Sequence, residues 1–311
     1  MSNQSTKLRL PIIQAPMFLQ SGPEMVIASA KAGIMGSFPT PNTRTPEQLE
    51  QWLIQITEAL ADTPFEHNWA INLIMHPTYP RREIDLALAV KYKAPAVITA
   101  LGSPKGALND VHSYGGKVYA DVINLDFAKK AAAAGADGLA LVCAGAGGHT
   151  GFLSPFAFLE EVRCFFDGDI ILSGAIGSGK AIHAAKVLGA DYVYMGTRFI
   201  ASEESMAVDA YKTMVTESNI SDIVTSDAIT GVKANWLKDS LIAAGFDPNN
   251  MPGAANINFA EAGIDSKRWK DIWAAGQGVG ASTQVDTIAT IVDQLEREYR
   301  ASVQDQQGEQ Q

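Results

Sequence analysis

Cysteine is scarce in this chain, which holds two cysteines among 311 residues, Cys143 and Cys164. Their positions do not match the spacing of a zinc site, and two thiols cannot form the disulfide framework of a small secreted domain. Both are therefore expected to be free, buried thiols, and no metal site is predicted. For Cys143, core packing is favoured over a nucleophilic role, because it lies in an apolar run with no base or helix N-terminus beside it.

Long hydrophobic runs and clusters of basic residues are also absent. The most apolar stretch, residues 131–146, is interrupted by two glycines and an aspartate and cannot span a bilayer. The first residues, MSNQSTKLRLP, lack the apolar segment of a secretion signal. The formal net charge of −10 argues against a nucleic-acid surface, since phosphate contacts need clustered Lys and Arg. These absences predict a soluble cytoplasmic protein that binds neither membrane nor nucleic acid.

Short apolar runs alternate with helical patterns through the first two-thirds of the chain. Nearly continuous apolar runs are typical of parallel strands that are covered on both faces. About eight runs qualify, which is the number that closes a (β/α)8 barrel. The expected strands are residues 12–17, 33–37, 69–74, 96–101, 117–122, 138–144, 170–175 and 192–196, and the helices expected between them include residues 46–60, 81–91, 125–134 and 155–165.

The alternation stops after Phe199. Residues 202–275 contain many acids, the segment DPNNMPG and no strand pattern, which predicts an inserted helical substrate domain that acts as a lid. Residues 281–300 have the pattern of one amphipathic helix that packs back on the barrel. The predicted fold class is therefore α/β, a TIM barrel formed by residues 1–201 and 276–311, with residues 202–275 as the helical lid.

The segment SGAIGSGKAIHAAKVLGADYVYMGTRF, residues 173–199, contains two glycine-rich turns around one helix. Ser178 has the residue type of an N-cap, and a helix that begins after such a turn points backbone N–H groups at one place, where an anion binds. Each turn alone also fits an ordinary connection between strand and helix. The turns follow the seventh and eighth expected strands, however, where barrels of this type hold a phosphate.

Rigid or polar residues stand at the ends of three other expected strands. In QAPMF, the proline leaves Ala15, Pro16 and Met17 as a rigid edge that suits a flat ring, although the proline could also simply end the strand. Asn72, an amide in the apolar run AINLIMHP, either ties a neighbouring loop or bonds a ligand. Asp121, in YADVIN, places a carboxylate among apolar residues, where it needs a pairing donor such as a ring N–H.

The segment VCAGAGGHTG places His149 among four glycines, including Gly148. This pattern predicts an imidazole at the mouth of the barrel beside backbone that a ligand can approach. A neutral imidazole can remove a proton from a carbon acid or hydrogen-bond an anion, whereas a histidine that only caps a turn is the alternative. Near the end, WAAGQGVG places Gln277 in another glycine-rich loop, which could return over the mouth as a lid.

Together, the segments PIIQAPM, AGAGGHTG, SGAIGSGKAIHAAKVLGADYVYMGTRF and WAAGQGVG resemble the nitronate monooxygenase family, formerly called 2-nitropropane dioxygenases, over nearly the whole chain. The phosphate segment alone is also similar to that of inosine-monophosphate dehydrogenase and other nucleotide barrels. The AGGHxG loop, joined to QAPM and AGQ, is more specific to this family and to the related FMN-dependent enoyl-ACP reductases.

The resemblance implies a TIM barrel that holds FMN non-covalently beneath a helical substrate domain. His149 would be the catalytic base or substrate anchor. Family members tend to carry a lysine where this chain has Asp121, so the pyrimidine edge of the flavin would meet an acidic group that disfavours negative charge at N1 of the reduced ring. The implied cofactor-binding residues are Ala15, Pro16 and Met17 along the ring, Asn72, Asp121, Gly148 and Gln277 around it, and Gly174, Ala175, Gly177, Gly196 and Thr197 at the phosphate.

The implied activity is oxidation of alkyl nitronates by O2 to a carbonyl compound and nitrite, extended to nitroalkanes if His149 removes their α-proton. The alternative is an NAD(P)H-dependent flavin reductase that acts on quinones or enoyl thioesters, for which the chain shows no separate dinucleotide fingerprint. A flavin-binding module without turnover is the non-enzymatic alternative. The expected partners are a small-molecule substrate and O2, and the physiological substrate and a homodimer are left open.

Overall fold

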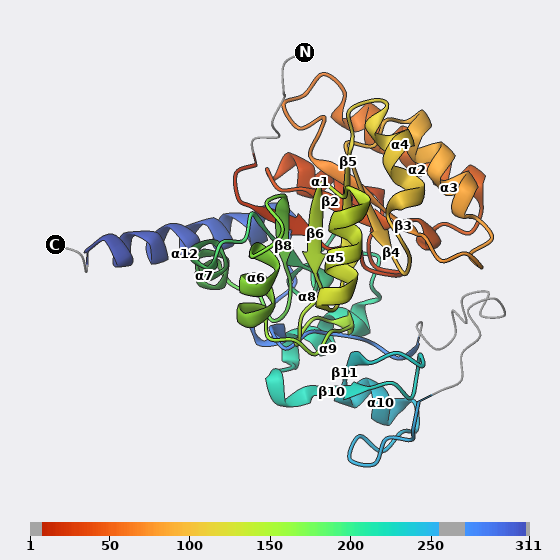
Figure 1. Cartoon of the computed structure of the whole chain (residues 1–311). Helices are drawn as coiled ribbons and strands as arrows, with labels where there is room; N and C mark the ends of the chain where they lie inside the picture. The colour runs from red at the N-terminus through yellow and green to blue at the C-terminus, as the bar shows by residue number, and fades with distance from the viewer. Residues whose placement is uncertain (1–7, 255–270, 309–311) are drawn as a thin grey trace.

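The computed structural model describes residues 8–254 and 271–308, and eight parallel strands form its centre (Figure 1). Neighbouring strands follow the order β1-β9-β8-β6-β5-β4-β3-β2. A parallel bridge between Ile13 and Met35 joins the two ends of this order and closes the barrel. The predicted TIM barrel is therefore confirmed. The strands are β1 (Ile12–Gln14), β2 (Gly36–Pro39), β3 (Trp69–Ile74), β4 (Ala96–Ala100), β5 (Lys117–Val122), β6 (Gly138–Leu141), β8 (Asp169–Leu172) and β9 (Tyr192–Met195).

All eight predicted strands have a counterpart in the structure, but several are shorter than expected, and the strand predicted at 33–37 is displaced to Gly36–Pro39. The predicted ranges 12–17, 138–144 and 170–175 run too far, because the chain leaves the ladder after Gln14, Leu141 and Leu172. The first residue after each of these strands, Ala15, Val142 or Ser173, still donates one backbone hydrogen bond to a neighbouring strand, and the chain then turns over the end of the barrel. Several of these following residues line the cavity described below, namely Ala15, Pro16, Met17, Val142, Ser173, Gly174 and Ala175.

Helices cover the outside of the barrel, as the alternation predicted. The side chains of Asn124 and Ser178 accept hydrogen bonds from backbone N–H groups three residues later and so begin α5 and α7. Both helices end at glycines with positive φ, Gly135 and Gly189. The outer helices are α1 (Pro23–Lys31), α2 (Pro46–Leu60), α3 (Arg82–Lys91), α4 (Lys105–His112), α5 (Leu125–Ala134), α6 (Pro155–Arg163), α7 (Gly179–Leu188) and α12 (Ile288–Gly308), and a 3-10 turn, η1 (Thr40–Asn42), follows β2.

The last helix differs from its predicted range of 281–300. Residues Val279–Ala281 form a 3-10 turn, η3, and α12 begins at Ile288. Between them the backbone of Asp286 bonds Ala201 and Glu203, so this stretch is held as a loop. The helix then continues to Gly308 and projects beyond the barrel (Figure 1).

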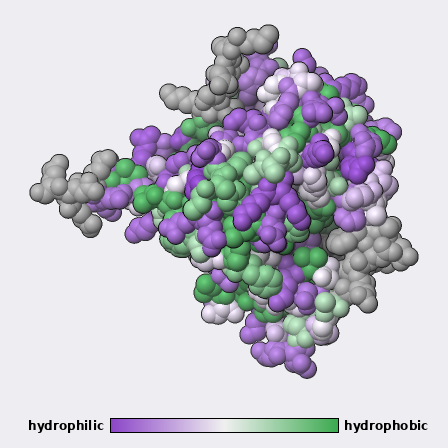
Figure 2. All heavy atoms as spheres, in the orientation of Figure 1, coloured by the Kyte–Doolittle hydropathy of each residue, from purple (hydrophilic) through white to green (hydrophobic). Residues whose placement is uncertain are grey.

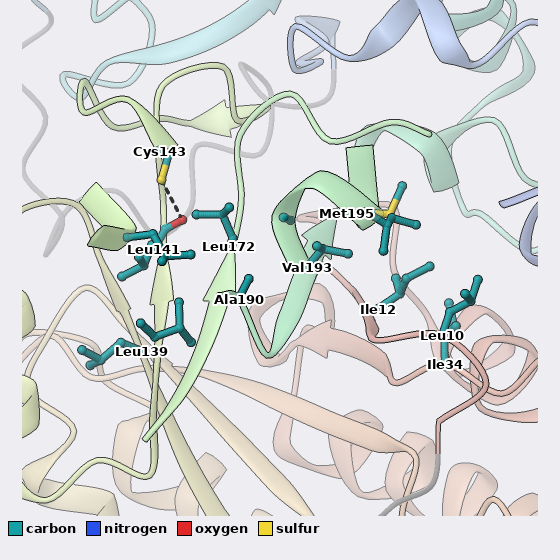
Figure 3. Close-up of a cluster of buried hydrophobic side chains, with 14 of the residues drawn as sticks. Leu10, Ile12, Ile34, Leu139, Leu141, Cys143, Leu172, Ala190, Val193 and Met195 are labelled. Carbon is teal, nitrogen blue, oxygen red and sulfur yellow. Dashed lines mark hydrogen bonds between the residues drawn. The ribbon is translucent and has the colours of Figure 1, made fainter. Parts of the chain in front are cut away.

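The strands bury side chains on both faces, which explains their continuous apolar sequence. One face fills the barrel with residues such as Ile98, Tyr119 and Ile171. The other packs against the helices, and Figure 3 shows this layer with Leu139, Leu141, Leu172, Val193 and Met195 labelled. Each such side chain contributes about 1.5–3 kcal/mol when fully buried.

The two cysteines lie in different surroundings. Cys143 is fully buried in the outer layer, and its thiol donates to the Leu141 carbonyl at 3.4 Å (Figure 3). This position confirms the expected core packing. Cys164 is exposed, so the prediction that both thiols are buried is wrong. It stands directly after the end of α6, where the helix no longer covers it.

The segment after the barrel strands gathers at one end of the barrel (Figure 1). The expectation of helix and loop alone in residues 202–275 is wrong, because two antiparallel strands pair there and residues 148–149 join them as a third. Residues 255–270 lie outside the described residues, and the bounds of the lid stay a prediction. The elements are α8 (Thr197–Ile200), α9 (Asp209–Glu217), η2 (Ile220–Asp222), β10 (Ile223–Ser226), β11 (Ala234–Leu237), α10 (Lys238–Ala243) and the pairing strand β7 (Gly148–His149).

The surface of the described chain has a mixed character. Figure 2 shows hydrophobic and hydrophilic residues interspersed over one face. None of the described helices combines the length and the apolar content that crossing a membrane would require.

Candidate active site

A cavity of about 1220 Å³ lies where the barrel strands end and the β10–β11 segment begins. A second hollow, of about 650 Å³, lies between α5 and α6 near the starts of β6 and β8. Active sites of parallel barrels form at the carboxyl ends of the strands, so the larger cavity is the candidate site. Eleven predicted site residues line it, namely Ala15, Pro16, Met17, Asn72, Asp121, Gly148, His149, Gly174, Ala175, Gly196 and Thr197.

Two predicted site residues, Gly177 and Gln277, do not line the cavity. A Cβ on Gly177 would lie 2.8 Å from the Gly278 carbonyl oxygen, so this glycine allows close contact between two loops. Gln277 has an exposed side chain, and its backbone N–H donates to the Gly145 carbonyl at 2.9 Å. The loop does return to the mouth, where Trp273, Ala274, Gly276 and Gly278 line the cavity and Gln277 does not.

The glycines near His149 serve loop packing as well as the cavity. A Cβ on Gly147 would lie 2.7 Å from the Gly276 nitrogen, so the loops around these residues meet backbone to backbone. The Gly276 N–H donates to the Thr197 hydroxyl at 2.8 Å, which ties the returning loop to the end of β9. The expectation that these glycines mainly open the backbone to a ligand is therefore incomplete.

Replacing Thr197 by Val is expected to lower the free energy of unfolding by about 1–3 kcal/mol. Val has nearly the same shape but no acceptor, so the partly buried Gly276 N–H loses its partner. Thr197→Ser keeps the hydroxyl and is the matched control. Urea unfolding of the three proteins measures the effect, and equal losses in both variants would show that the hydrogen bond is not the cause.

His149 is held by the antiparallel sheet beside the cavity. It pairs with Ala234 and its neighbour Gly148 pairs with Asn235, both on β11. The Asn235 side chain adds a hydrogen bond to the Ala146 carbonyl at 2.7 Å. Burial lowers the pKa of the imidazole, so the ring is neutral at neutral pH. A neutral ring can accept a proton, as general-base chemistry requires.

Asp121 and Asn72 reach the cavity from the inner face of the barrel. Burial raises the pKa of the Asp121 carboxyl from 3.8 to about 7, because ionisation would leave a charge with little water around it. Its neighbours along β5, Ala120 and Val122, point to the outer layer. The Asn72 side chain is buried and lines the cavity. It donates to the Ile98 carbonyl at 3.2 Å, so it ties the neighbouring strand β4 and not a loop, and its bond to a ligand stays a prediction.

The turn after β8 has unusual backbone geometry. Gly174 has a φ of +106°, and a Cβ there would lie 2.6 Å from the Ala144 carbonyl oxygen. Ala175 has a φ of 59° although it carries a Cβ, a conformation that costs energy and is often found at ligand sites. Within the described chain, the N–H groups of residues 174–177 donate to no backbone carbonyl. The turn is therefore suited to receive an anion.

The helix that follows this turn is not available to a ligand at its first residues. The Ser178 hydroxyl accepts from the Ala181 N–H, and the Gly179 N–H donates to the Glu298 carboxylate of α12 at 2.8 Å. The expectation that α7 points these N–H groups at an anion is wrong, because a carboxylate from 119 residues away already occupies its N-terminus. The turn itself and the start of α8 remain for that purpose.

Sequence reasoning missed several residues of the cavity wall. Trp273 stacks on Tyr211 with ring centroids 5.0 Å apart, and both line the cavity. Phe127 and Lys130 reach its rim from α5, and Tyr194 reaches it from β9. The tyrosines in YVYM and the tryptophan in WAAGQGVG are large aromatic residues near the predicted site, and this could have suggested a place on the cavity wall. Only the strand register, however, shows whether such a residue faces the cavity or the core. No group of three His, Cys, Asp or Glu side chains in the described chain could hold a metal ion.

A parallel eight-stranded barrel whose strand ends enclose a large cavity, with an imidazole and a carboxyl group on its wall, defines an α/β-barrel enzyme. The chain belongs to the nitronate monooxygenase family, whose family model matches residues 2–298. This match confirms the resemblance inferred from the sequence segments. The protein is therefore an oxidoreductase, and its family consists of flavin enzymes.

Individual relatives are distant. The chain is 27% identical to the Nitronate monooxygenase of Paraburkholderia phytofirmans, over 94% of this chain and 93% of the relative. It is also 27% identical to the (3aS,4S,5R,7aS)-5-hydroxy-7a-methyl-1-oxo-octahydro-1H-indene-4-carboxyl-CoA dehydrogenase of Rhodococcus jostii, over 78% of this chain and 67% of the relative. A crystal structure of nitroalkane oxidase from Streptomyces ansochromogenes matches 98% of this chain and 99% of its own with a TM-score of 0.81 and 22% identity, a likeness of fold.

Proposed function

We propose that the protein binds FMN and oxidises alkyl nitronates with O2, releasing a carbonyl compound and nitrite. The observation that carries this proposal is the neutral His149 imidazole at a large cavity in a member of the nitronate monooxygenase family. The relative from Paraburkholderia phytofirmans and the nitroalkane oxidase fold point to the same substrate class.

The cavity fits a flavin mononucleotide together with a small substrate. Pockets for one small ligand measure about 300–1,000 Å³, and this cavity measures about 1220 Å³. The turn at Gly174 and Ala175 suits the phosphate, and Ala15, Pro16 and Met17 offer a rigid edge for the ring. FMN would supply the electron-accepting chemistry that amino-acid side chains lack.

The chain's own residues position the substrate and move its proton. His149 would accept the α-proton of a neutral nitroalkane at a ring nitrogen, or donate a hydrogen bond to an oxygen of a preformed nitronate. The pairing of β7 with β11 holds the backbone of His149 in place, which reduces the cost of positioning the residue during the reaction. Tyr211 and Trp273 form an aromatic wall that helps to exclude water.

Aerobic turnover tests this function. With propyl-2-nitronate, the purified protein is expected to consume O2 and release nitrite together, to lose both activities when FMN is removed and to regain them when FMN is restored. Substrate without enzyme is the blank. Absence of nitrite from a fully flavin-loaded sample would overturn the proposal.

A reductase that acts on quinones or enoyl thioesters is the second candidate function. The dehydrogenase relative from Rhodococcus jostii is named for a coenzyme A thioester. In this chain Leu101, Ile123 and Phe127 are exposed apolar residues at the cavity rim, beside Lys130. Such a rim suits a substrate longer than a small nitronate, and NAD(P)H oxidation in the presence of a quinone or an enoyl thioester distinguishes this candidate.

A further inference from the structure

Two buried oxygen atoms in the candidate active site have no hydrogen-bond partner within residues 8–254 and 271–308. They are Oδ1 of Asp121 and the hydroxyl oxygen of Tyr194. Both residues line the cavity, one from β5 and the other from β9. Buried polar groups are normally paired, and an unpaired one costs free energy. Two such atoms in one cavity therefore indicate a ligand that pairs with them.

Strand alternation places both side chains inside the barrel. Along β9, Tyr194 packs in the inner layer with Ile13 and Ile171, while Val193 points to the outer layer. Along β5, Tyr119 lies in the inner layer, and Asp121 follows two residues later on the same face. Burial is the main cause that raises the pKa of Tyr194, and the charge of Asp121 is the second.

The surroundings of Asp121 contain little charge. The strands paired with β5 are β4 and β6, and neither carries an ionisable side chain. The ionisable residues of α4 and α5 lie outside the barrel, except that Lys130 reaches the cavity rim. The other ionisable side chains on the cavity wall are His76, Tyr79, His149, Tyr194 and Tyr211. Loss of water is the cause that raises the pKa of the Asp121 carboxyl to about 7.

We propose that the Asp121 carboxyl and the Tyr194 hydroxyl donate hydrogen bonds from the floor of the cavity to the acceptor atoms at one edge of the flavin ring. In this arrangement the Asp121 carboxyl is protonated. The inference rests on the flavin of the proposed function but not on its nitronate chemistry. A protonated carboxyl and a phenol each donate one hydrogen bond. The pyrimidine edge of the flavin ring carries two carbonyl oxygens and the unprotonated N1 beside a single N–H donor, N3–H, whereas the opposite edge carries methyl groups. The acceptor atoms of the first edge therefore face Asp121 and Tyr194.

Proton linkage follows from this arrangement. In the cofactor-free protein, the Asp121 carboxyl releases its proton as the pH rises through about 7. If the flavin binds only the protonated form, its binding above that pH must take up one proton. The dissociation constant for FMN then rises with pH, by up to about tenfold per pH unit, since one pKa unit corresponds to a tenfold change in the protonated fraction.

The test measures FMN binding to protein from which the flavin has been removed, by fluorescence quenching between pH 6 and pH 9. Wild type is expected to bind FMN about 50-fold more weakly at pH 9 than at pH 7, because the protonated fraction of a carboxyl with a pKa of about 7 falls from one half to about one hundredth. Calorimetry at pH 8 in two buffers of different ionisation enthalpy is expected to show uptake of close to one proton per FMN. Asp121→Asn keeps a hydrogen-bond donor but cannot titrate, and it is expected to remove both the proton uptake and the pH dependence beyond that of FMN itself.

Two further variants distinguish hydrogen bonding by Asp121 and Tyr194 from a general effect of removing a charge or a polar group. Asp126→Asn removes an exposed carboxylate five positions further along and should behave as wild type. Tyr194→Phe should weaken FMN binding at pH 6 by about threefold to tenfold, the value of one hydrogen bond, and keep the pH dependence. FMN binding without proton uptake would overturn this inference and leave the proposed function intact, whereas a failure to bind FMN at any pH would overturn both.

Discussion

Replacing His149 by Asn is expected to abolish turnover of neutral nitroalkanes while turnover of preformed nitronates persists. A neutral nitroalkane must lose its α-proton before it can be oxidised, and a positioned general base contributes about 10²–10⁴-fold to such a step. Asn fills a similar volume and can hydrogen-bond an anion, but it cannot accept the proton. Parallel steady-state assays with 2-nitropropane and its nitronate measure the two effects.

The pH dependence of the same reaction follows from the buried imidazole. Because burial lowers the pKa of His149, the ring stays neutral to a lower pH than an exposed histidine, and nitroalkane turnover should fall only as the pH drops below the ordinary value of 6.5. His183→Asn is the matched control, since His183 bonds Ser302 on the outside of the barrel. Equal losses for nitroalkane and nitronate in His149→Asn would show that His149 anchors the substrate and is not the base.

Replacing Asp121 by Asn is expected to stabilise the cofactor-free protein at alkaline pH. The carboxyl pKa is about 7 in the fold against 3.8 ordinarily, so between these values the folded chain keeps a proton that the unfolded chain has lost. Wild type therefore loses stability as the pH rises from about 4 to about 7. At 1.36 kcal/mol per pKa unit, the loss is about 4 kcal/mol, and Asn avoids it.

Urea unfolding at pH 4.5 and pH 8 measures the stability difference between wild type and Asp121→Asn. From pH 4.5 to pH 8, the free energy of unfolding of Asp121→Asn minus that of wild type is expected to increase by about 3 kcal/mol or more, whatever the difference is at pH 4.5. Asp126→Asn, at an exposed position, should show no such increase. A constant difference would mean that Asp121 ionises in the fold at an ordinary pH.

The barrel could be predicted from the sequence because each of its strands and helices is marked by residues within that strand or helix or directly beside it. Each parallel strand is buried on both faces and so reads as an apolar run, and caps such as Asn124 and Ser178 mark where helices begin. Eleven of the thirteen predicted site residues, among them Asp121 and His149, line the cavity, because active sites lie where barrel strands end. Their roles toward a cofactor stay a prediction.

The features that were missed depend on contacts between distant parts of the chain. The Glu298 carboxylate at the start of α7 comes from the last helix, and β11, which holds His149, is a short strand with a polar Asn235. Tyr194 looks like any strand residue until the register shows that it shares the inner face with Asp121. Local patterns carry no information about such pairings, because they arise only when the chain closes on itself.

Anaerobic mixing of the purified protein, loaded with FMN, tests the proposed activity most directly. Propyl-2-nitronate is added to one cuvette and NADH or NADPH to another, and the flavin absorbance is followed in each. Nitronate oxidation predicts that nitronate alone changes the flavin spectrum, and that air restores the spectrum with release of nitrite. Rapid loss of absorbance with a pyridine nucleotide, and no change with nitronate, would contradict the proposed function and assign the protein as a reductase.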